Sequence, residues 1–91
     1  MTLWRIERTG LFVSSYRRLP SQLQSRVDEA ILHLAESENP AEAGIQKKGR
    51  FKGYLAYEIG RSYRLIYKVI NWQKIILLVV VGDHKSVYGK G

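Results

Sequence analysis

The chain has 91 residues and a formal net charge of +7, with 15 lysines and arginines against eight acidic residues. A chain of this length forms one domain, so we expect residues 1–91 to fold as a single unit. Hydrophobic residues make up 45% of it, which excludes a disordered chain, and the lack of cysteine excludes disulfides and thiolate metal sites. The positive charge favours a polyanionic partner, either nucleic acid or an acidic protein, although a basic surface that only aids solubility is the alternative.

Neither a membrane span nor an export signal is expected. The longest apolar run, residues 75–81, is too short to cross a bilayer. The first eight residues carry charges and lack the apolar stretch of a signal peptide. With no cysteine, the chain suits a reducing compartment, so we expect a cytoplasmic protein without a membrane partner.

The first elements predicted along the chain are a strand and a short helix. Residues 4–7 alternate apolar and charged side chains, as a half-buried strand does. Phe12, Tyr16 and Leu19 then recur at helical spacing, and Pro20 interrupts this helix.

A second, longer helix is predicted to follow the proline and to end near Asn39. Ser21 and Gln24 form a capping-box pattern at its start, and Pro20 could equally take the first helical position. Its apolar stripe is formed by Leu23, Val27, Ala30, Ile31, Leu34 and Ala35.

The second half of the chain predicts a basic loop and then strands. The loop spans residues 40–53 and contains three glycines. Strands are predicted over 54–59 and 63–69, and a hairpin turn over 71–74. Residues 75–81 are apolar at every position, which places them centrally in a sheet.

The element order is therefore β-α-α-β-β-β, which predicts an α+β domain. The two helices should cover one face of a small, mostly antiparallel sheet. In the strand over 63–69, one face carries Tyr63, Leu65, Tyr67 and Val69 and should meet the helices. The opposite face, with Arg64, Ile66 and Lys68, should then be open to a ligand.

Three segments resemble the RelE/ParE superfamily of toxins, over nearly the whole chain. They are Arg18-Leu19-Pro20, the strand phrase Tyr63-Arg64-Leu65-Ile66-Tyr67, and the ending from Val81 to Tyr88. The resemblance implies the toxin of a type II toxin–antitoxin pair with a RelE-like fold. Toxins of the RelE branch cut mRNA in the ribosomal A site without a metal, whereas the ParE branch poisons DNA gyrase.

The ending Ser86-Val87-Tyr88 is more similar to the RelE branch. The resemblance thus implies an endoribonuclease that inhibits translation, with a cognate antitoxin, the ribosome and mRNA as partners and no cofactor. The alternatives are a gyrase inhibitor without nuclease activity and a basic RNA-binding module without toxicity.

Three residues are candidates for the chemistry of metal-free RNA cleavage, which must hold a phosphate and move protons. Arg64 matches the phosphate-binding arginine of RelE-like toxins, and its planar cation suits two phosphate oxygens; the alternative is a surface arginine paired with a carboxylate such as Glu58. His84 suits proton transfer near neutral pH, or is an ordinary exposed loop histidine. Tyr88 matches a tyrosine near the end of these toxins that stacks on a base, or it packs the tail against the sheet.

The basic residues and one departure from the family complete the expected site. RNA contacts are expected from Lys47, Lys48, Arg50, Lys52, Arg61 and Lys85, although runs of charge are often only solvated surface. His33 lies off the apolar stripe and should be solvated. RelE carries catalytic lysines on the strand before the arginine, but residues 54–59 contain none. Proton transfer would then fall on His84, with Tyr57 or Glu58 in support, and a weaker or absent nuclease activity stays open.

Overall fold

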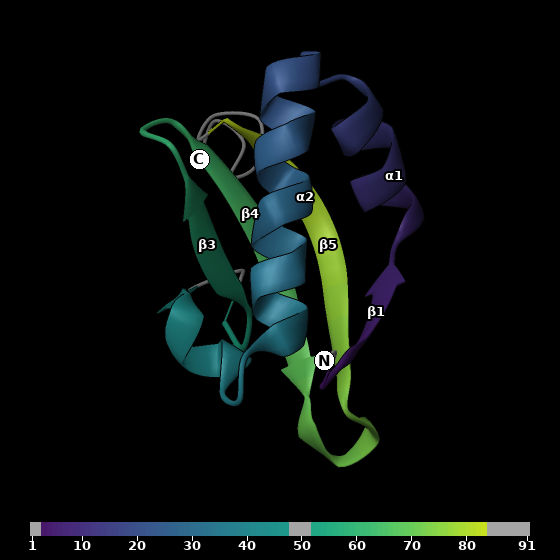
Figure 1. Ribbon diagram of the computed structural model, residues 1–91, viewed down its shortest axis with the longest axis vertical. Helices are drawn as coiled ribbons and strands as arrows, with labels where there is room; N and C mark the ends of the chain where they lie inside the picture. Colours follow the sequence, from purple (N-terminus) through teal and green to yellow (C-terminus); the bar gives the residue numbers. More distant parts are fainter. Residues whose placement is uncertain (1–2, 48–51, 84–91) are drawn as a thin grey trace.

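A computed structural model describes residues 3–47 and 52–83, and it has the α+β architecture expected from the sequence. Two helices lie on one face of a single sheet (Figure 1). The order of strands across the sheet is β1 (Arg5–Arg8), β5 (Ile75–Asp83), β4 (Tyr63–Ile70), β3 (Leu55–Ile59) and β2 (Ile45–Gln46). Only the β1–β5 pair is parallel, so the mostly antiparallel sheet is confirmed. The apolar strand β5 lies inside the sheet, as its sequence predicts.

The two helices are α1 (Gly10–Arg17) and α2 (Ser21–Glu36). The prediction of a capping box at the start of α2 is wrong. Pro20 is the N-cap, and its side chain cannot accept a hydrogen bond from the first turn of the helix. The side-chain amide of Gln24 instead donates to the carbonyl of Tyr16 at 3.0 Å, which joins the two helices. The helix ends at Glu36, earlier than expected, because Ser37 has an extended backbone.

The main core lies between the helices and the sheet. From α2 it receives the predicted stripe, in which Leu34 is fully buried and Leu23 only half-buried. Leu65 and Tyr67 of β4 meet this stripe, as the alternation along the strand predicts. Such burial contributes about 1.5–3 kcal/mol for each large apolar side chain, which makes it the main stabilising contribution to the fold.

The start of α1 is tied to β5 beyond the point where β1 ends. A bulge in β5 follows Leu78, and the last residue of β1 pairs with that same position. The hydroxyl of Thr9 accepts from the backbone N–H of Phe12 at 3.0 Å, as an N-cap, and donates to the carbonyl of Val79 at 2.7 Å. The hydroxyl of Ser15 accepts from the backbone N–H of Val81 at 3.1 Å. Side chains of α1 therefore satisfy the backbone of β5 where no neighbouring strand does.

The segment expected to be a loop contains two short elements that its sequence does not predict. They are a 3₁₀ helix, η1 (Pro40–Ala43), and strand β2. The buried hydroxyl of Tyr67 donates to the carbonyl of Pro40 at 2.7 Å. A side chain at Gly44 would bring its Cβ to 3.0 Å from a ring carbon of Tyr67 and closer still to its hydroxyl. The segment is therefore held against β4 by one tyrosine.

The predicted hairpin turn is confirmed between β4 and β5. It contains the 3₁₀ turn η3 (Asn71–Gln73), followed by Lys74 in the left-handed conformation with φ of 57°. The ammonium of Lys74 lies 4.7 Å from the ring centroid of Trp4, whereas Trp72 is 84% exposed at the tip. Within the described ranges, 3–47 and 52–83, neither helix has the length and apolar character that crossing a membrane requires.

The face of the sheet opposite α1 and α2, which no helix covers within residues 3–47 and 52–83 and which is called the helix-free face below, is more apolar than expected. Arg64 and Lys68 lie on it, but Ile66 between them is fully buried, so the expectation of an open face is wrong at this position. Ile66 packs with Ala56 and Val80 in a second cluster, and the half-buried Tyr54 lies against it. The physical reason is that neighbouring strands also place apolar side chains on this face, which the pattern of β4 alone does not reveal.

Candidate functional site

Arg64 projects from β4 at the end of the sheet where β4 begins. Its side chain is 21% exposed. One terminal nitrogen, Nη1, donates to the carbonyl of Tyr63 at 3.0 Å and to that of Arg61 at 3.4 Å. These bonds fold the guanidinium back toward the turn between β3 and β4. Backbone carbonyls therefore hold the guanidinium in one orientation, which favours a role in binding.

Glu58 on β3 is the partner of Arg64 across the ladder. The register pairs the two residues directly, and Arg64 Nη2 lies 3.8 Å from Glu58 Oε2. The carboxylate is 53% exposed and the separation is long, so the ion pair contributes at most about 1 kcal/mol. A phosphate could replace this carboxylate as the partner of Arg64. An arginine that donates two hydrogen bonds to a phosphate is bound more strongly than one that makes a single long contact with a carboxylate.

Tyr57 takes the opposite side of the sheet from Arg64. It pairs with Leu65 and packs against the main core, below α2. Its hydroxyl lies 3.2 Å from His33 Nδ1, and the two rings meet edge to face with centroids 6.0 Å apart. His33 is exposed, as expected, but it is hydrogen-bonded to Tyr57. The structure thus separates Tyr57 from Arg64, whereas Glu58 shares a face with it.

Several of the expected site residues lie outside the described part of the chain. His84, Lys85 and Tyr88 follow the last described residue, and Lys48 and Arg50 fall in the gap between the two described ranges. Their roles remain predictions from the sequence. Lys47, Lys52 and Arg61 are described: Lys47 is half-buried, and the other two are exposed.

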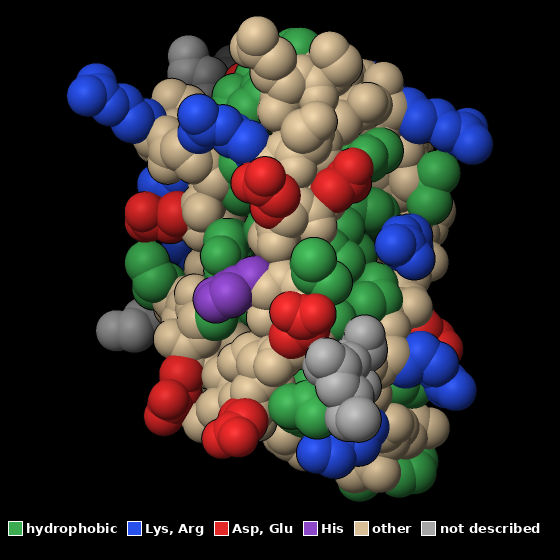
Figure 2. Space-filling model, viewed as in Figure 1, with side chains coloured by type: hydrophobic (Ala, Val, Ile, Leu, Met, Phe, Trp, Pro, Cys, Tyr) green, Lys and Arg blue, Asp and Glu red, His purple; other side chains and the backbone are tan. Residues whose placement is uncertain are grey.

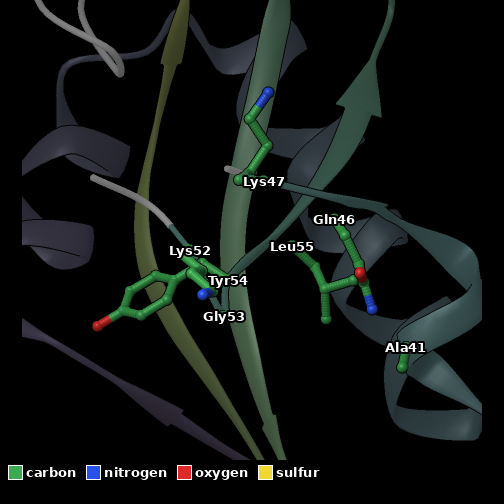
Figure 3. A pocket seen from close by; sticks show the side chains of 7 residues that line it. All are labelled: Ala41, Gln46, Lys47, Lys52, Gly53, Tyr54 and Leu55. Carbon is green, nitrogen blue, oxygen red and sulfur yellow. The ribbon is translucent and has the colours of Figure 1, made fainter. Parts of the chain in front are cut away.

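A second group of polar and aromatic residues lies on the helix-free face, at the start of β3. The ammonium of Lys68 lies 5.5 Å from the ring centroid of Tyr54. Tyr54 also lines a cavity of about 610 Å³ together with Lys47 and Lys52 (Figure 3). The alternation of β4 predicts Lys68 on this face, whereas the sequence alone predicts no role for Tyr54. The feature of the sequence that could have indicated Tyr54 is its position between the basic loop and the first residue of strand β3.

The helix-bearing face is less suited to a polyanion. Figure 2 shows acidic and basic side chains interspersed over it. Among its contacts, the hydroxyl of Tyr16 donates to Asp28 Oδ1 at 2.7 Å. This hydrogen bond to the carboxylate raises the pKa of Tyr16. A nucleic acid would meet repulsion as well as attraction here, so the helix-free face is the better candidate surface.

Within residues 3–47 and 52–83, no three His, Asp or Glu side chains lie close enough together to hold a metal ion. The described residues of the site are instead an arginine, lysines, a carboxylate and a tyrosine. Such a set binds anions and stacks on planar groups.

Comparison with known proteins identifies similar sequences and folds. A family model described as the ParE toxin of the type II toxin–antitoxin system, parDE, matches residues 6–88. No curated protein sequence matches the chain. A chain of the RelBE2 toxin–antitoxin complex from Mycobacterium tuberculosis superposes with a TM-score of 0.79 at 19% identity, covering 92% of this chain and 94% of that one.

Two further solved structures have the same fold. A mutant of the E. coli toxin RelE in the free state has a TM-score of 0.75 at 17% identity, over 97% of this chain and 90% of that one. A chain of the archaeal RelE–RelB complex from Pyrococcus horikoshii OT3 has a TM-score of 0.72 at 22% identity, over 98% of this chain and 99% of that one. These similarities extend over almost the full length of each chain.

Proposed function

The chain belongs to the ParE toxin family of type II toxin–antitoxin systems, within the RelE/ParE superfamily, and from this premise we propose that it stops translation by cutting mRNA on the ribosome. The observation that carries the proposal is Arg64, a partly buried cation positioned by two backbone carbonyls on the helix-free face. Lys68 and Tyr54 extend the same face with a second cation and an aromatic ring.

In the proposed reaction, the 2′-hydroxyl of one nucleotide attacks the neighbouring phosphorus, and the bond from phosphorus to the 5′-oxygen breaks. The hydroxyl loses a proton to a base, and the leaving oxygen gains one from an acid. The guanidinium of Arg64 leaves Glu58 and binds the phosphate. It neutralises the negative charge that builds up on the phosphate oxygens. We assign the proton transfers to His84 and base stacking to Tyr88, in keeping with the sequence analysis.

The proposed partners are an antitoxin, the ribosome and mRNA. The similar chains from M. tuberculosis and P. horikoshii come from toxin–antitoxin complexes. By analogy, we propose that an acidic or amphipathic segment of an antitoxin covers the helix-free face or the basic loop of this chain. Charge complementarity with a +7 chain would increase mainly the association rate and the specificity. If the chain is purified after expression from its own operon and no partner protein is bound to it, this part of the proposal is contradicted.

The test is cleavage of mRNA on programmed ribosomes in single-turnover conditions. Arg64→Ala should slow cleavage by about 10²–10³, which is typical for the loss of one group that stabilises charge in the transition state. Arg64→Lys should restore only part of the rate, because a lysine lacks the planar two-pronged grip. Arg5→Ala is the matched control, since Arg5 also pairs with a glutamate, Glu7, at 3.4 Å but on an outer strand. An Arg64→Ala chain that cuts as fast as wild type would overturn the role of Arg64.

His84 is tested separately in the same assay. His84→Gln should slow cleavage by roughly 10²–10⁴ and should flatten the pH profile in the range where a histidine titrates. Ribosome binding should survive, because other basic residues supply most of the electrostatic attraction. An unchanged rate would remove His84 from the mechanism.

Inhibition of DNA gyrase is the second candidate function. Two observations favour it: β3 carries no lysine, and an acidic residue, Glu58, stands beside Arg64. The two functions predict opposite orders of events when the chain is induced alone in a bacterium. Pulse labelling should show protein synthesis falling first if mRNA is cut, and DNA synthesis falling first if gyrase is the target.

A further inference from the structure

Strand β1 forms one edge of the sheet, and its outer side has no neighbouring strand in the described part of the chain (Figure 1). The backbone N–H of Arg5 donates to the carbonyl of Lys74 at 2.9 Å, and that of Thr9 bonds to β5 in the same way. Backbone groups of alternate residues point to opposite sides of a strand, so those of Ile6 and Arg8 point away from β5. The edge therefore offers a donor and an acceptor at each of two positions, which is the basis for pairing with another strand.

A second copy of β1 can pair with this edge in only a few registers. Two identical strands that run antiparallel are related by a two-fold axis, so the same surface is used on both chains. Residues whose backbone groups point outward must lie opposite one another in such a pair. This places the axis at Arg5, Ile6 or Glu7 and excludes the positions between them, where an outward-pointing residue would face one that is bonded to β5.

The charges of β1 favour one of these three registers. Ile6 packs against the main core, so Arg5 and Glu7 lie on the helix-free face, where their side chains are 70% and 48% exposed. An axis at Arg5 or at Glu7 would set two like charges directly opposite each other, which destabilises a strand pair. An axis at Ile6 sets Arg5 opposite the partner's Glu7 and lets the two Ile6 residues exchange backbone hydrogen bonds. The edge is therefore complementary to itself in one register only.

We propose that this chain forms a two-fold symmetric dimer through β1, with Ile6 at the axis, so that the sheets of two copies join into one. Arg5 and Glu7 already lie 3.4 Å apart within one chain, and in the dimer each carboxylate lies beside two guanidinium groups. Strands of four residues bury less than the roughly 1,200 Å² of stable complexes, so the dimer is weak and depends on concentration.

The net charge of +7 on each chain opposes association but does not prevent it. At an ionic strength of about 0.15 M, charges more than about 8 Å apart are largely screened, whereas paired strands lie about 5 Å apart. The interface lies two strands away from Arg64 and needs neither RNA nor an antitoxin, so its failure would leave the proposed function unchanged. At the low concentrations of a cleavage assay the chain is a monomer, so variants of Arg5 and Glu7 remain controls there.

The test is sedimentation velocity of the purified chain from about 5 μM to about 1 mM, the range in which weak dimers form. Wild type should pass from monomer to dimer as its concentration rises. Arg5→Glu and Glu7→Arg each set like charges opposite one another at two positions, and each should weaken the dimer roughly 5- to 100-fold. Lys52→Glu is the matched control, because it makes the same change of charge at an exposed position away from β1 and should dimerise like wild type.

A chain that carries both Arg5→Glu and Glu7→Arg tests the register. With the axis at Ile6, opposite charges again face each other, so this double variant should dimerise like wild type. An axis at residue 5 or 7 would still set like charges opposite one another. Both side chains are exposed, so all three variants should fold, and thermal unfolding checks this.

The backbone N–H of Ile6 reports the strand pairing directly. It points away from β5 in one chain and donates to the partner's Ile6 in the dimer. Its hydrogen exchange, followed by NMR, should slow as the concentration of wild type rises but should stay fast in Arg5→Glu. The N–H of Glu7 points toward β5 and should be protected equally in both proteins.

Several outcomes would overturn the dimer. A wild-type chain that stays monomeric over the whole concentration range would do so, as would a double variant as monomeric as Arg5→Glu. An equal loss of association in Lys52→Glu would show that net charge and not the edge of β1 controls it. If the exchange of Ile6 slows only when an antitoxin is added to a monomeric chain, the edge belongs to the antitoxin and not to a second copy.

Discussion

The guanidinium of Arg64 on β4 lies 3.8 Å from the carboxylate of Glu58, its direct partner on β3. The two groups are unequally solvated, since the arginine is 21% exposed and the glutamate 53%. Backbone carbonyls hold the arginine in place, so it would keep its position if the glutamate were lost. Glu58 therefore competes with an incoming phosphate for Arg64 without being needed to position it.

We accordingly predict that Glu58→Gln increases the activity of the toxin. Removal of one negative charge beside the phosphate site should strengthen RNA binding by a few fold and leave the free energy of unfolding within about 0.5 kcal/mol of wild type. RNA affinity and single-turnover cleavage measure the effect, and Glu7→Gln, which removes the same charge on β1, is the control. Slower cleavage by Glu58→Gln would instead indicate that this carboxylate takes part in proton transfer.

The order of elements and their core faces could be predicted from the sequence because their periodicity is strong. The stripe of α2 and the alternation of β4 each depend on local pattern, and both are confirmed. The strand β2 has only two residues, Ile45 and Gln46, and is too short to show a period. The bulge after Leu78 could not be read from β5 either, because every residue around it is apolar.

Site residues could be predicted from the sequence where their position depends on one strand alone, but not where it depends on the packing of two elements. Arg64 was placed on the correct face by alternation alone. The sequence also predicts Glu58 as an alternative partner of Arg64, and the structure shows that pair. The contact of Lys68 with Tyr54 was not predicted, because it joins two strands and depends on their register. Likewise, His33 was expected to be solvated, but its contact with Tyr57 requires the packing of α2 on β3.

A pH-dependent loss of stability is predicted from the buried Tyr67. Burial raises the pKa of Tyr67 to about 12 from its ordinary value of 10.0. The folded state therefore favours the neutral phenol, and this stabilisation is complete below pH 10 and is lost as the pH rises from 10 to 12. The loss should be about 1.4 kcal/mol for each pH unit in that window. Chemical denaturation of wild type and Tyr67→Phe across this range measures it, because lysine titration affects both proteins; parallel curves would contradict the prediction.

The close approach of Gly44 to Tyr67 predicts a coupled pair of substitutions. Gly44→Ala should destabilise the fold by about 1–3 kcal/mol, since its Cβ would collide with a hydroxyl that is buried and hydrogen-bonded to Pro40. In a Tyr67→Phe background the same change should cost less, because the colliding oxygen is gone. Gly10→Ala is the control, with open space around its Cβ. Equal costs in the two backgrounds, measured by a double-mutant cycle, would show that the contact does not limit this position.

The last prediction concerns Thr9, whose one hydroxyl caps α1 and bonds to β5. Thr9→Ala removes the acceptor for the N–H of Phe12 and the donor to Val79, so it should cost about 2 kcal/mol and lower Tm by roughly 8–16 °C. Thr9→Ser keeps the hydroxyl and should recover most of that loss. Ser14→Ala removes an exposed hydroxyl from the same helix and should change Tm little. A Thr9→Ala protein as stable as the Ser14→Ala protein would mean that β5 holds its bulge without help from α1.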